Sequence, residues 1–200
     1  MKIIIVGASG TIGQAVANEL KPRHEIIHVG LTHGDLTVDI SDQDSICAMY
    51  KTTGKVDAVI ATTGKVHFGE FVHMDDELYQ LGLHNKLMGQ VNLVQLGLSY
   101  LNQGGSFTLT SGILNLDPIR YGVSAAMVNG AIDAFVKASA IEMPSSIRIN
   151  VVSPTVVSEA LGSYGEYFRG FKSVPVSEVA LAYSKSTEGL QTGQVYRVGY

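Results

Sequence analysis

The chain has 200 residues, of which 46% are hydrophobic, and its formal net charge at pH 7 is -4. This length and hydrophobic fraction suit one compact domain over residues 1–200 and exclude a disordered chain. The acidic balance, without a basic stripe, argues against nucleic acid as a partner, and no apolar run approaches the ~20 residues of a membrane span. Cys47 is the single cysteine and the six histidines lack metal-ligand spacing. We therefore expect a cytoplasmic protein with no metal site and no membrane partner.

A strand, a glycine turn and a helix open the chain. The apolar run at residues 3–6 ends at Gly7, and Gly10 and Gly13 follow at three-residue intervals. The next apolar residues recur every four positions, as on one face of a helix: Ile12, Val16 and Leu20. Glycines allow the backbone to approach a pyrophosphate, and the amides and dipole of the helix favour its charge. The segment therefore predicts a dinucleotide-binding site.

The rest of the chain alternates between strands and helices. Strands are predicted at residues 25–29, 37–40, 56–61, 106–110, 148–152 and 194–198. Helices are predicted at residues 41–50, opened by a capping box, at 76–101 and 123–142, and as a short last helix from about Ser177. This order predicts an α/β fold with a single Rossmann-like, doubly wound parallel sheet and helices on both faces. Because only about seven residues separate the second and third strands, either a bare extended return joins them or one of them is misplaced.

Glycines alternate with aromatic residues between residues 158 and 174. The glycines are Gly162, Gly165 and Gly170, and the aromatic residues are Tyr164, Tyr167, Phe168 and Phe171. This pattern suits a mobile lid over an apolar substrate. It equally suits an ordinary surface loop whose aromatic side chains cover the edge of the sheet, so both interpretations stay open.

Short motifs lie at the ends of the predicted strands. They are Asp39-Ile40, Ala61-Thr62-Thr63-Gly64, Thr110-Ser111, the run Arg148-Ile149-Asn150-Val151-Val152-Ser153-Pro154, and Thr192-Gly193-Gln194. Together with the glycine turn, and in this order, they resemble the short-chain dehydrogenase/reductase family along the whole chain, in a shortened form. The resemblance implies a nicotinamide dinucleotide bound at the carboxyl edge of the sheet.

The resemblance assigns the cofactor to residues along that edge. They are Gly7, Ser9, Gly10, Thr11, Ile12 and Gly13 in the turn, Leu31, Thr32 and His33 after the second strand, Asp39 and Ile40 at the adenine, Ala61, Thr62 and Gly64 after the fourth strand, and Asn129, Pro154 and Val156. An acidic residue closing the second strand would bind a 2′-hydroxyl and repel a 2′-phosphate, but Gly30 and Leu31 stand there. We therefore expect NADP, and keep NAD as the alternative because no Arg or Lys is at hand and Asp35 lies in the same loop.

The Tyr-x-x-x-Lys pair of the family is missing. In the family the tyrosine transfers the substrate proton, the lysine lowers the tyrosine pKa, a serine steadies the substrate oxygen and an asparagine completes a proton relay. Matching the helix at residues 123–142 without a gap puts Ala125 at the tyrosine position and Asn129 at the lysine position. Placing Tyr121 at the tyrosine position instead needs four extra residues, and under either alignment the lysine is absent.

Three side chains remain as candidates for catalysis: Ser111, Lys86 and Tyr121. Ser111 is the retained member of the family's set and would position the substrate oxygen. Lys86 stands at the asparagine position and would supply a cation or an acid if it points inward rather than into solvent. Tyr121 either reaches into the vacated site or packs at the start of its helix. Asn129 would hydrogen-bond a ribose in place of the lysine.

We therefore expect a short-chain-type oxidoreductase that uses NADP(H), or NAD(H), on a small carbonyl or alcohol substrate, with a proton from Lys86, Tyr121 or water. The alternative is a catalytically degenerate nucleotide-binding sensor or interaction protein, which the loss of the tyrosine favours. An isomerase or epimerase ranks last because such relatives also use the tyrosine pair. The long helices resemble those through which the family forms homodimers or homotetramers, and we expect such an assembly.

Overall fold

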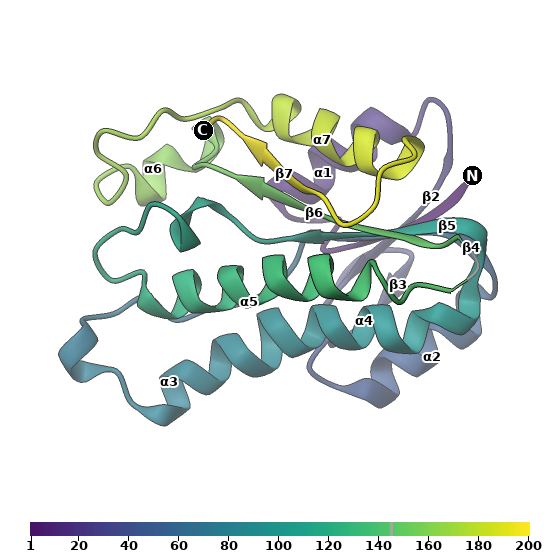
Figure 1. The fold of residues 1–200 in the computed structure, drawn as a ribbon, viewed down its shortest axis with the longest axis horizontal. Helices are drawn as coiled ribbons and strands as arrows, with labels where there is room; N and C mark the ends of the chain where they lie inside the picture. Colours follow the sequence, from purple (N-terminus) through teal and green to yellow (C-terminus); the bar gives the residue numbers. More distant parts are fainter. Residues whose placement is uncertain (145) are drawn as a thin grey trace.

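A computed structural model describes residues 1–144 and 146–200 and is built around a parallel sheet (Figure 1). The seven strands are β1 (Lys2–Val6), β2 (Glu25–Gly30), β3 (Leu36–Thr37), β4 (Val56–Ala61), β5 (Leu101–Thr110), β6 (Arg148–Pro154) and β7 (Val195–Val198). Their order across the sheet is β3-β2-β1-β4-β5-β6-β7, with parallel pairing throughout. The winding reverses between β1 and β4, where open sheets of this kind bind ligands. The predicted doubly wound, Rossmann-like fold is confirmed.

Helices cover both faces of this sheet. They are α1 (Thr11–Leu20), α2 (Gln43–Thr53), α3 (Asp76–Leu81), α4 (Gly89–Gly97), α5 (Val123–Ser139), α6 (Leu161–Tyr164) and α7 (Val176–Glu188). α1 and α7 pack together on one face, while α2, α4 and α5 cover the other (Figure 1). Ile3 and Ile5 of β1 belong to the apolar core beneath α1 and α7, and Ile4 and Val6 belong to the opposite core. The alternation of side chains along a strand thus explains the unbroken apolar run that opens the chain.

A bare loop joins β2 to β3. β3 holds only Leu36 and Thr37, which pair in parallel with the end of β2. The prediction of a strand at residues 37–40 is therefore wrong in its limits. The sequence left open whether an extended return joins the second and third strands or one strand is misplaced, and the structure has the extended return. The chain leaves the sheet because it turns toward α2, where the Asp42 N–H donates to the Asp39 carbonyl (3.1 Å).

The predicted helix at residues 76–101 is interrupted. α3 continues into a π-helical segment, η2 (Gly82–Met88), then into α4, and a 3-10 turn at Leu98–Tyr100 ends it. β5 begins at Leu101, well before the predicted strand at 106–110, because Leu101 already pairs with Val56. The register then shifts between β4 and β5, which accommodates Gly104 at a φ of 74°.

The boundaries of two helices, α2 and α5, also differ from the sequence prediction. Asp42 caps α2 by accepting from the Asp44 N–H (2.9 Å), in place of the serine before it, and the helix runs to Thr53. α5 stops at Ser139 rather than at residue 142, and the Ser139 hydroxyl donates back to the Phe135 carbonyl (2.7 Å).

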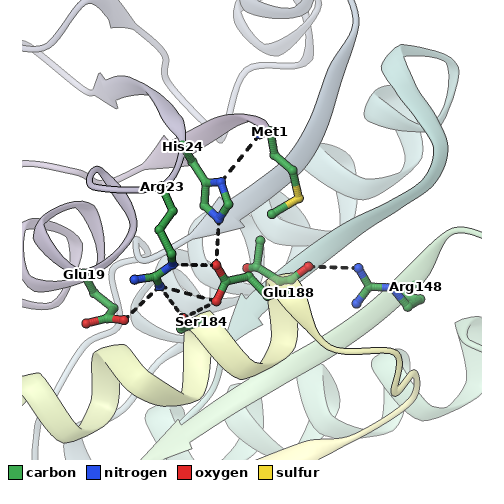
Figure 2. A network of polar contacts seen from close by, with 8 residues as sticks. Met1, Glu19, Arg23, His24, Arg148, Ser184 and Glu188 are labelled. Atoms are coloured by element: carbon green, nitrogen blue, oxygen red, sulfur yellow. Dashed lines mark hydrogen bonds and ion pairs between the residues drawn. The ribbon is translucent and has the colours of Figure 1, made fainter.

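A polar network ties the turn after α1 to the end of α7, at the amino ends of the strands (Figure 2). Arg23 donates to Glu188 Oε1 (2.8 Å) and to Glu19 Oε1 (3.0 Å). His24 Nε2 also lies 2.8 Å from Glu188 Oε1, and the Ser184 hydroxyl donates to Glu188 Oε2 (2.7 Å). These bonds, that from Arg23 above all, lower the pKa of Glu188 to about 2.

Candidate active site

The glycine turn between β1 and α1 leaves room for an anion. A Cβ at Gly7, whose φ is 89°, would lie 2.8 Å from the Thr62 carbonyl, and one at Gly13 would lie 2.2 Å from the Gly7 carbonyl. Close backbone packing therefore requires both glycines. At Gly10 the nearest atom would be 3.4 Å away, and no side chain caps α1. The first amides of α1 are thus open to a pyrophosphate.

A cavity of about 300 Å³ lies beside this turn, and we call it the β2-side cavity. Gly7, Leu31, Asp39 and Ile40, four of the predicted cofactor residues, line it. Hydrogen bonds from the hydroxyl and the backbone N–H of Ser41 lower the pKa of Asp39. The ionised carboxylate can accept a hydrogen bond from an amino group such as that of adenine.

The end of β2 is shaped by Gly30. A Cβ there would lie 2.2 Å from the His33 carbonyl, so the turn excludes any side chain at this position. Asp35 folds back onto the strand, where its Oδ2 accepts from the His28 N–H (2.8 Å). Thr32 Oγ1 and His33 Nδ1 lie 2.7 Å apart and bond to each other rather than lining the β2-side cavity.

A second cavity, of about 350 Å³, opens at the carboxyl ends of β4, β5 and β6, and we call it the edge cavity. Nine residues singled out from the sequence line it: Ile12, Thr62, Gly64, Lys86, Ser111, Ala125, Asn129, Pro154 and Val156. Ser9 and Thr11 lie exposed in the glycine turn. Ala61 is fully buried, and its carbonyl accepts from the Thr110 hydroxyl, so it holds the strand end and faces neither cavity.

Lys86 reaches the edge cavity from η2. Its ammonium donates to Asn129 Oδ1 (2.8 Å) and lies 3.4 Å from the Ser111 carbonyl. Burial of the amino group lowers the pKa of Lys86 to about 8, against the opposing charge of Asp133. A π-helical segment often marks a functional site, and here it carries the one lysine of the cavity lining in the described chain.

Lysine and asparagine are exchanged at positions 86 and 129 relative to the family pattern that the sequence comparison implies. By the gap-free alignment of the sequence analysis, Asn129 on α5 takes the position of the family's lysine, and Lys86 takes that of its asparagine. The Asn129 side chain is oriented by its other end, because Nδ2 donates to the Gly112 carbonyl (3.1 Å). The amide therefore presents its oxygen to the lysine, and a cation and an amide still meet in the cavity.

Ser111 offers an unused hydroxyl at the same place. Its backbone N–H donates to the Val152 carbonyl (3.0 Å), which fixes the end of β5 against β6. The residue is only 4% exposed, yet Oγ has no hydrogen-bond partner in the described chain. Buried hydroxyls are normally paired, so this one is suited to a ligand atom in the cavity.

Gln90 links the segments that carry Lys86 and Ser111, and the sequence prediction missed it. This fully buried side chain accepts from the Thr110 N–H (2.8 Å) and donates to the Thr110 carbonyl (3.0 Å) and the Lys86 carbonyl (3.1 Å). A polar residue inside the uncharged run that follows Lys86 was the available signal. Buried glutamines need partners, and these lie on the neighbouring strand.

Tyr121 does not reach the edge cavity. It has a φ of 68° before α5 begins and lines a separate surface hollow with Glu70 and Arg120. Its hydroxyl lies 3.4 Å from Glu70 Oε1, and the Arg120 guanidinium stacks 4.5 Å from its ring centre. The packing interpretation of Tyr121 fits this placement, and we assign it no role in proton transfer.

The segment between β6 and α7 lies over the edge cavity. Ala160, Tyr164 and Phe168 contribute to its lining, and the Tyr164 ring packs 6.3 Å from that of Phe68. A bridge between Val157 and Val174 closes the segment at its base. Tyr164 and Phe168 therefore form part of the cavity wall, and whether this segment moves as a lid stays a prediction.

The glycine turn, the strand order and the two cavities define a Rossmann-type dinucleotide-binding protein. A family model described as enoyl-(acyl carrier protein) reductase matches residues 5–190. The chain belongs to the short-chain dehydrogenase/reductase family. No significant match was found among curated proteins.

Solved structures agree with this assignment. A protein from Listeria innocua, lin1944, is 49% identical, with a TM-score of 0.97 and 98% of each chain covered. A small-chain dehydrogenase in complex with NADPH is 28% identical, with a TM-score of 0.89, covering 99% of this chain and 96% of the other. Another small-chain dehydrogenase is 29% identical, with a TM-score of 0.85, and the match covers 99% of this chain and 95% of the other.

Within residues 1–144 and 146–200, no helix has the length and apolar character needed to cross a membrane. Nor do three His, Cys, Asp or Glu side chains gather there as metal ligands would.

Proposed function

We propose that the protein is an oxidoreductase that uses NADP(H) to interconvert a small carbonyl compound and its alcohol. The observation that carries the proposal is the meeting of Lys86 and Ser111 in the edge cavity, next to residues expected to hold the cofactor. The cofactor, when bound, supplies or accepts the hydride. The protein contributes a hydrogen-bond donor for the substrate oxygen and a proton for the product.

Ser111 and Lys86 divide these two tasks. The free Ser111 hydroxyl donates to the substrate oxygen and orients it. The Lys86 ammonium gives up the proton, because a pKa of about 8 keeps it protonated at pH 7 while leaving the acid strong enough to transfer. Asn129 holds the ammonium by accepting one of its hydrogens.

NADP is the cofactor that the β2-side cavity favours. Gly30 presents no side chain, and Asp35, the carboxylate nearest in sequence, is engaged by the His28 N–H. Asp35 is thereby held away from a 2′-phosphate, and the Asp39 carboxylate, which lines the same cavity, is offset by the nearby charge of Lys65. A Cβ at Gly30 would lie 3.6 Å from Ser9 Oγ, which makes the Ser9 hydroxyl a donor for that phosphate. The NADPH complex of a 28% identical relative supports the choice.

A second candidate function is nucleotide binding without catalysis. One observation favours it: the edge cavity has the methyl group of Ala125 where the family has its tyrosine. Under this proposal Lys86 would serve only to bind the cofactor.

Oxidation of NADPH by a panel of aldehydes and ketones, followed by absorbance, separates the two functions. We expect turnover, and we expect Lys86→Met to lower kcat by at least about a hundredfold, the usual contribution of a general acid, while NADPH binding weakens little. Lys137→Met, an exposed lysine on α5, is the matched control. Tight NADPH binding without turnover would establish the second function, and full activity of the Lys86 variant would remove its assigned role.

We also propose that copies of the chain associate as a homodimer or homotetramer. Val123 and Met127 of α5 are 39% and 43% exposed, which gives this helix an apolar outer surface. Light scattering on the purified protein tests the assembly, and a monomer at micromolar concentration would contradict it.

A further inference from the structure

We propose that the edge cavity selects uncharged, apolar carbonyl compounds, that an aryl or branched alkyl substituent lies against Ala125, and that this residue sets the size of substituent accepted. The inference rests on the proposed function, which supplies the reaction, and adds the class of substrate. It follows from the charge of the lining, from an apolar wall, and from the small side chain at position 125.

The described lining of the edge cavity contains no partner for a second charged group. Among the described residues that line it, Lys86 alone carries a full charge, and that ammonium already meets Asn129 and the Ser111 carbonyl. Arg120, a cation on the loop before α5, contacts Glu70 and Tyr121 in a separate hollow. An ionised group on the far side of a substrate would therefore lose water without gaining a partner.

An apolar wall faces the polar end of the cavity. Ile113, Leu114 and Ala125 form a buried cluster, and Val66 and Phe168 pack against it from two loops. All five residues line the cavity. A hydrocarbon substituent placed here leaves water for an apolar surface, which is favourable in proportion to the area covered.

The side chain at position 125 determines how much of this wall is free. Ala125 is 2% exposed and presents its methyl group to the cavity. Any longer side chain at this position would extend into the same space, as the tyrosine of the resembled family would. Residues expected to contact the cofactor, such as Ile12 and Pro154, share the 350 Å³, so the remainder suits one ring or a short branched chain.

The polar end accepts a single oxygen atom. The Ser111 hydroxyl is unpartnered in the described chain, and Lys86 lies beside it through the Ser111 carbonyl. A carbonyl oxygen uses both donors, while the rest of the molecule meets only carbon. The geometry thus favours a substrate orientation with the oxygen inward and the apolar substituent toward Ala125 and the segment between β6 and α7.

A matched pair of aldehydes tests the charge rule. With NADPH in excess, kcat/KM is measured for benzaldehyde and for para-carboxybenzaldehyde, which differ by one ionised group. We expect the neutral compound to be favoured by at least about tenfold, because the carboxylate is desolvated without a partner. Equal values, or a preference for the carboxylate, would overturn the inference.

Ala125→Leu tests the size rule. We expect kcat/KM for benzaldehyde to fall at least about tenfold, while that for acetaldehyde changes less than about threefold, because only the larger substituent needs the space. Ala48→Leu makes the same change on an exposed position of α2, outside the site and the proposed subunit interface, and should affect neither. An equal loss for both aldehydes, or no loss for benzaldehyde, contradicts the role of Ala125.

Binding separates this inference from the proposed function. If no carbonyl compound is turned over, benzamide and para-carboxybenzamide are titrated into the NADPH-loaded protein by ligand-observed NMR. Preferential binding of benzamide, weakened by Ala125→Leu, would support the cavity's selectivity, while the missing turnover alone would refute the proposed function. Binding of neither compound, or of the charged one preferentially, would refute the selectivity itself.

Discussion

Lys86 Nζ and Asn129 Oδ1 lie 2.8 Å apart, although the two residues are 43 positions apart and come from different helices. An amide oxygen accepts from the ammonium without contributing a full negative charge. Burial therefore dominates the electrostatics of the lysine, and its pKa falls to about 8. This relationship makes an acid that works near neutral pH out of a residue whose free pKa is near 10.5.

The rate of carbonyl reduction is expected to depend on the ionisation of Lys86. Because the ammonium is the acid, kcat should be level below pH 8 and fall about tenfold per unit above it, whereas alcohol oxidation, which needs the free amine, should rise through the same pH. Steady-state kinetics in both directions measure this. A reduction rate that stays level to pH 10 would contradict the assignment.

Asn129→Asp should shift the pH dependence of carbonyl reduction to higher pH. The substitution keeps the shape of the side chain but places a carboxylate against the ammonium, which stabilises the charged form and raises the pKa of Lys86 by about one unit or more. The alkaline limb of reduction should shift by the same amount. The new oxygen also faces the Gly112 carbonyl, so the melting temperature is recorded alongside.

Gln90→Met should show whether Gln90 contributes to catalysis as well as to the stability of the fold. The variant keeps the approximate volume but leaves the Thr110 N–H and carbonyl without their partners, at a cost of about 2 kcal/mol in the free energy of unfolding. Because the same amide binds the Lys86 carbonyl, kcat should also fall about tenfold while KM for NADPH changes little. Gln95→Met, exposed on α4, is the control. A stable variant with unchanged kcat would show that Gln90 has no positioning role.

Leu31→Asp should change the choice of cofactor. Leu31 is 54% exposed and lines the β2-side cavity just after Gly30, where an aspartate side chain has room. The carboxylate should weaken NADPH binding by about tenfold or more through repulsion of the 2′-phosphate and favour the 2′-hydroxyl of NADH. Titration of each cofactor measures the ratio, with Leu31→Asn as the uncharged control. An unchanged ratio would place the 2′-group elsewhere.

The network around Glu188 should make stability depend on acid pH. The folded pKa of about 2 lies below the ordinary 4.5, so its contribution is complete above pH 4.5 and is lost as the pH falls toward 2. At pH 7, Glu188→Gln should cost about 1 kcal/mol, since the pair with Arg23 is partly exposed, or about 2–4 °C in melting temperature. Near pH 2 the variant and the native protein should melt alike. Glu142→Gln, an exposed residue after α5, should show no such convergence.

Most of the sheet was predictable because the signals for its strands lie within short stretches of sequence. The run Ile3 to Val6, the three glycines and the alternation of apolar segments each report on a few neighbouring residues. β3 and the start of β5 were not predictable in the same way, since two paired residues and a register shift against Val56 depend on the neighbouring strand. The π-helical turn in η2 likewise depends on how Gly82 to Met88 packs against α5.

In the candidate site, too, features set by neighbouring residues were predictable and features set by distant contacts were not. The expectation that Ser111 lies at the carboxyl edge came from a strand end and matches the structure. Sequence alone did not decide whether Lys86 faces solvent or the interior, because that depends on the rotation of its helix. It also did not decide between the two roles of Tyr121, because that depends on the backbone conformation of the loop before α5. The sequence marked Gln90 only as a polar residue in an uncharged run, and its role was not predictable because its Thr110 partners lie 20 positions away on β5.

Gly64 sets a condition on any chain that uses this arrangement. A Cβ at Gly64, which has a φ of 136°, would lie 2.5 Å from Lys86 Cγ, so the lysine can cross beneath this loop only where the loop has no side chain. Three scattered positions (glycine at 64, lysine at 86 and asparagine at 129) therefore form one unit. A family member of this kind would be recognised in a genome by that combination of positions, where a search for a tyrosine followed four residues later by a lysine would discard it.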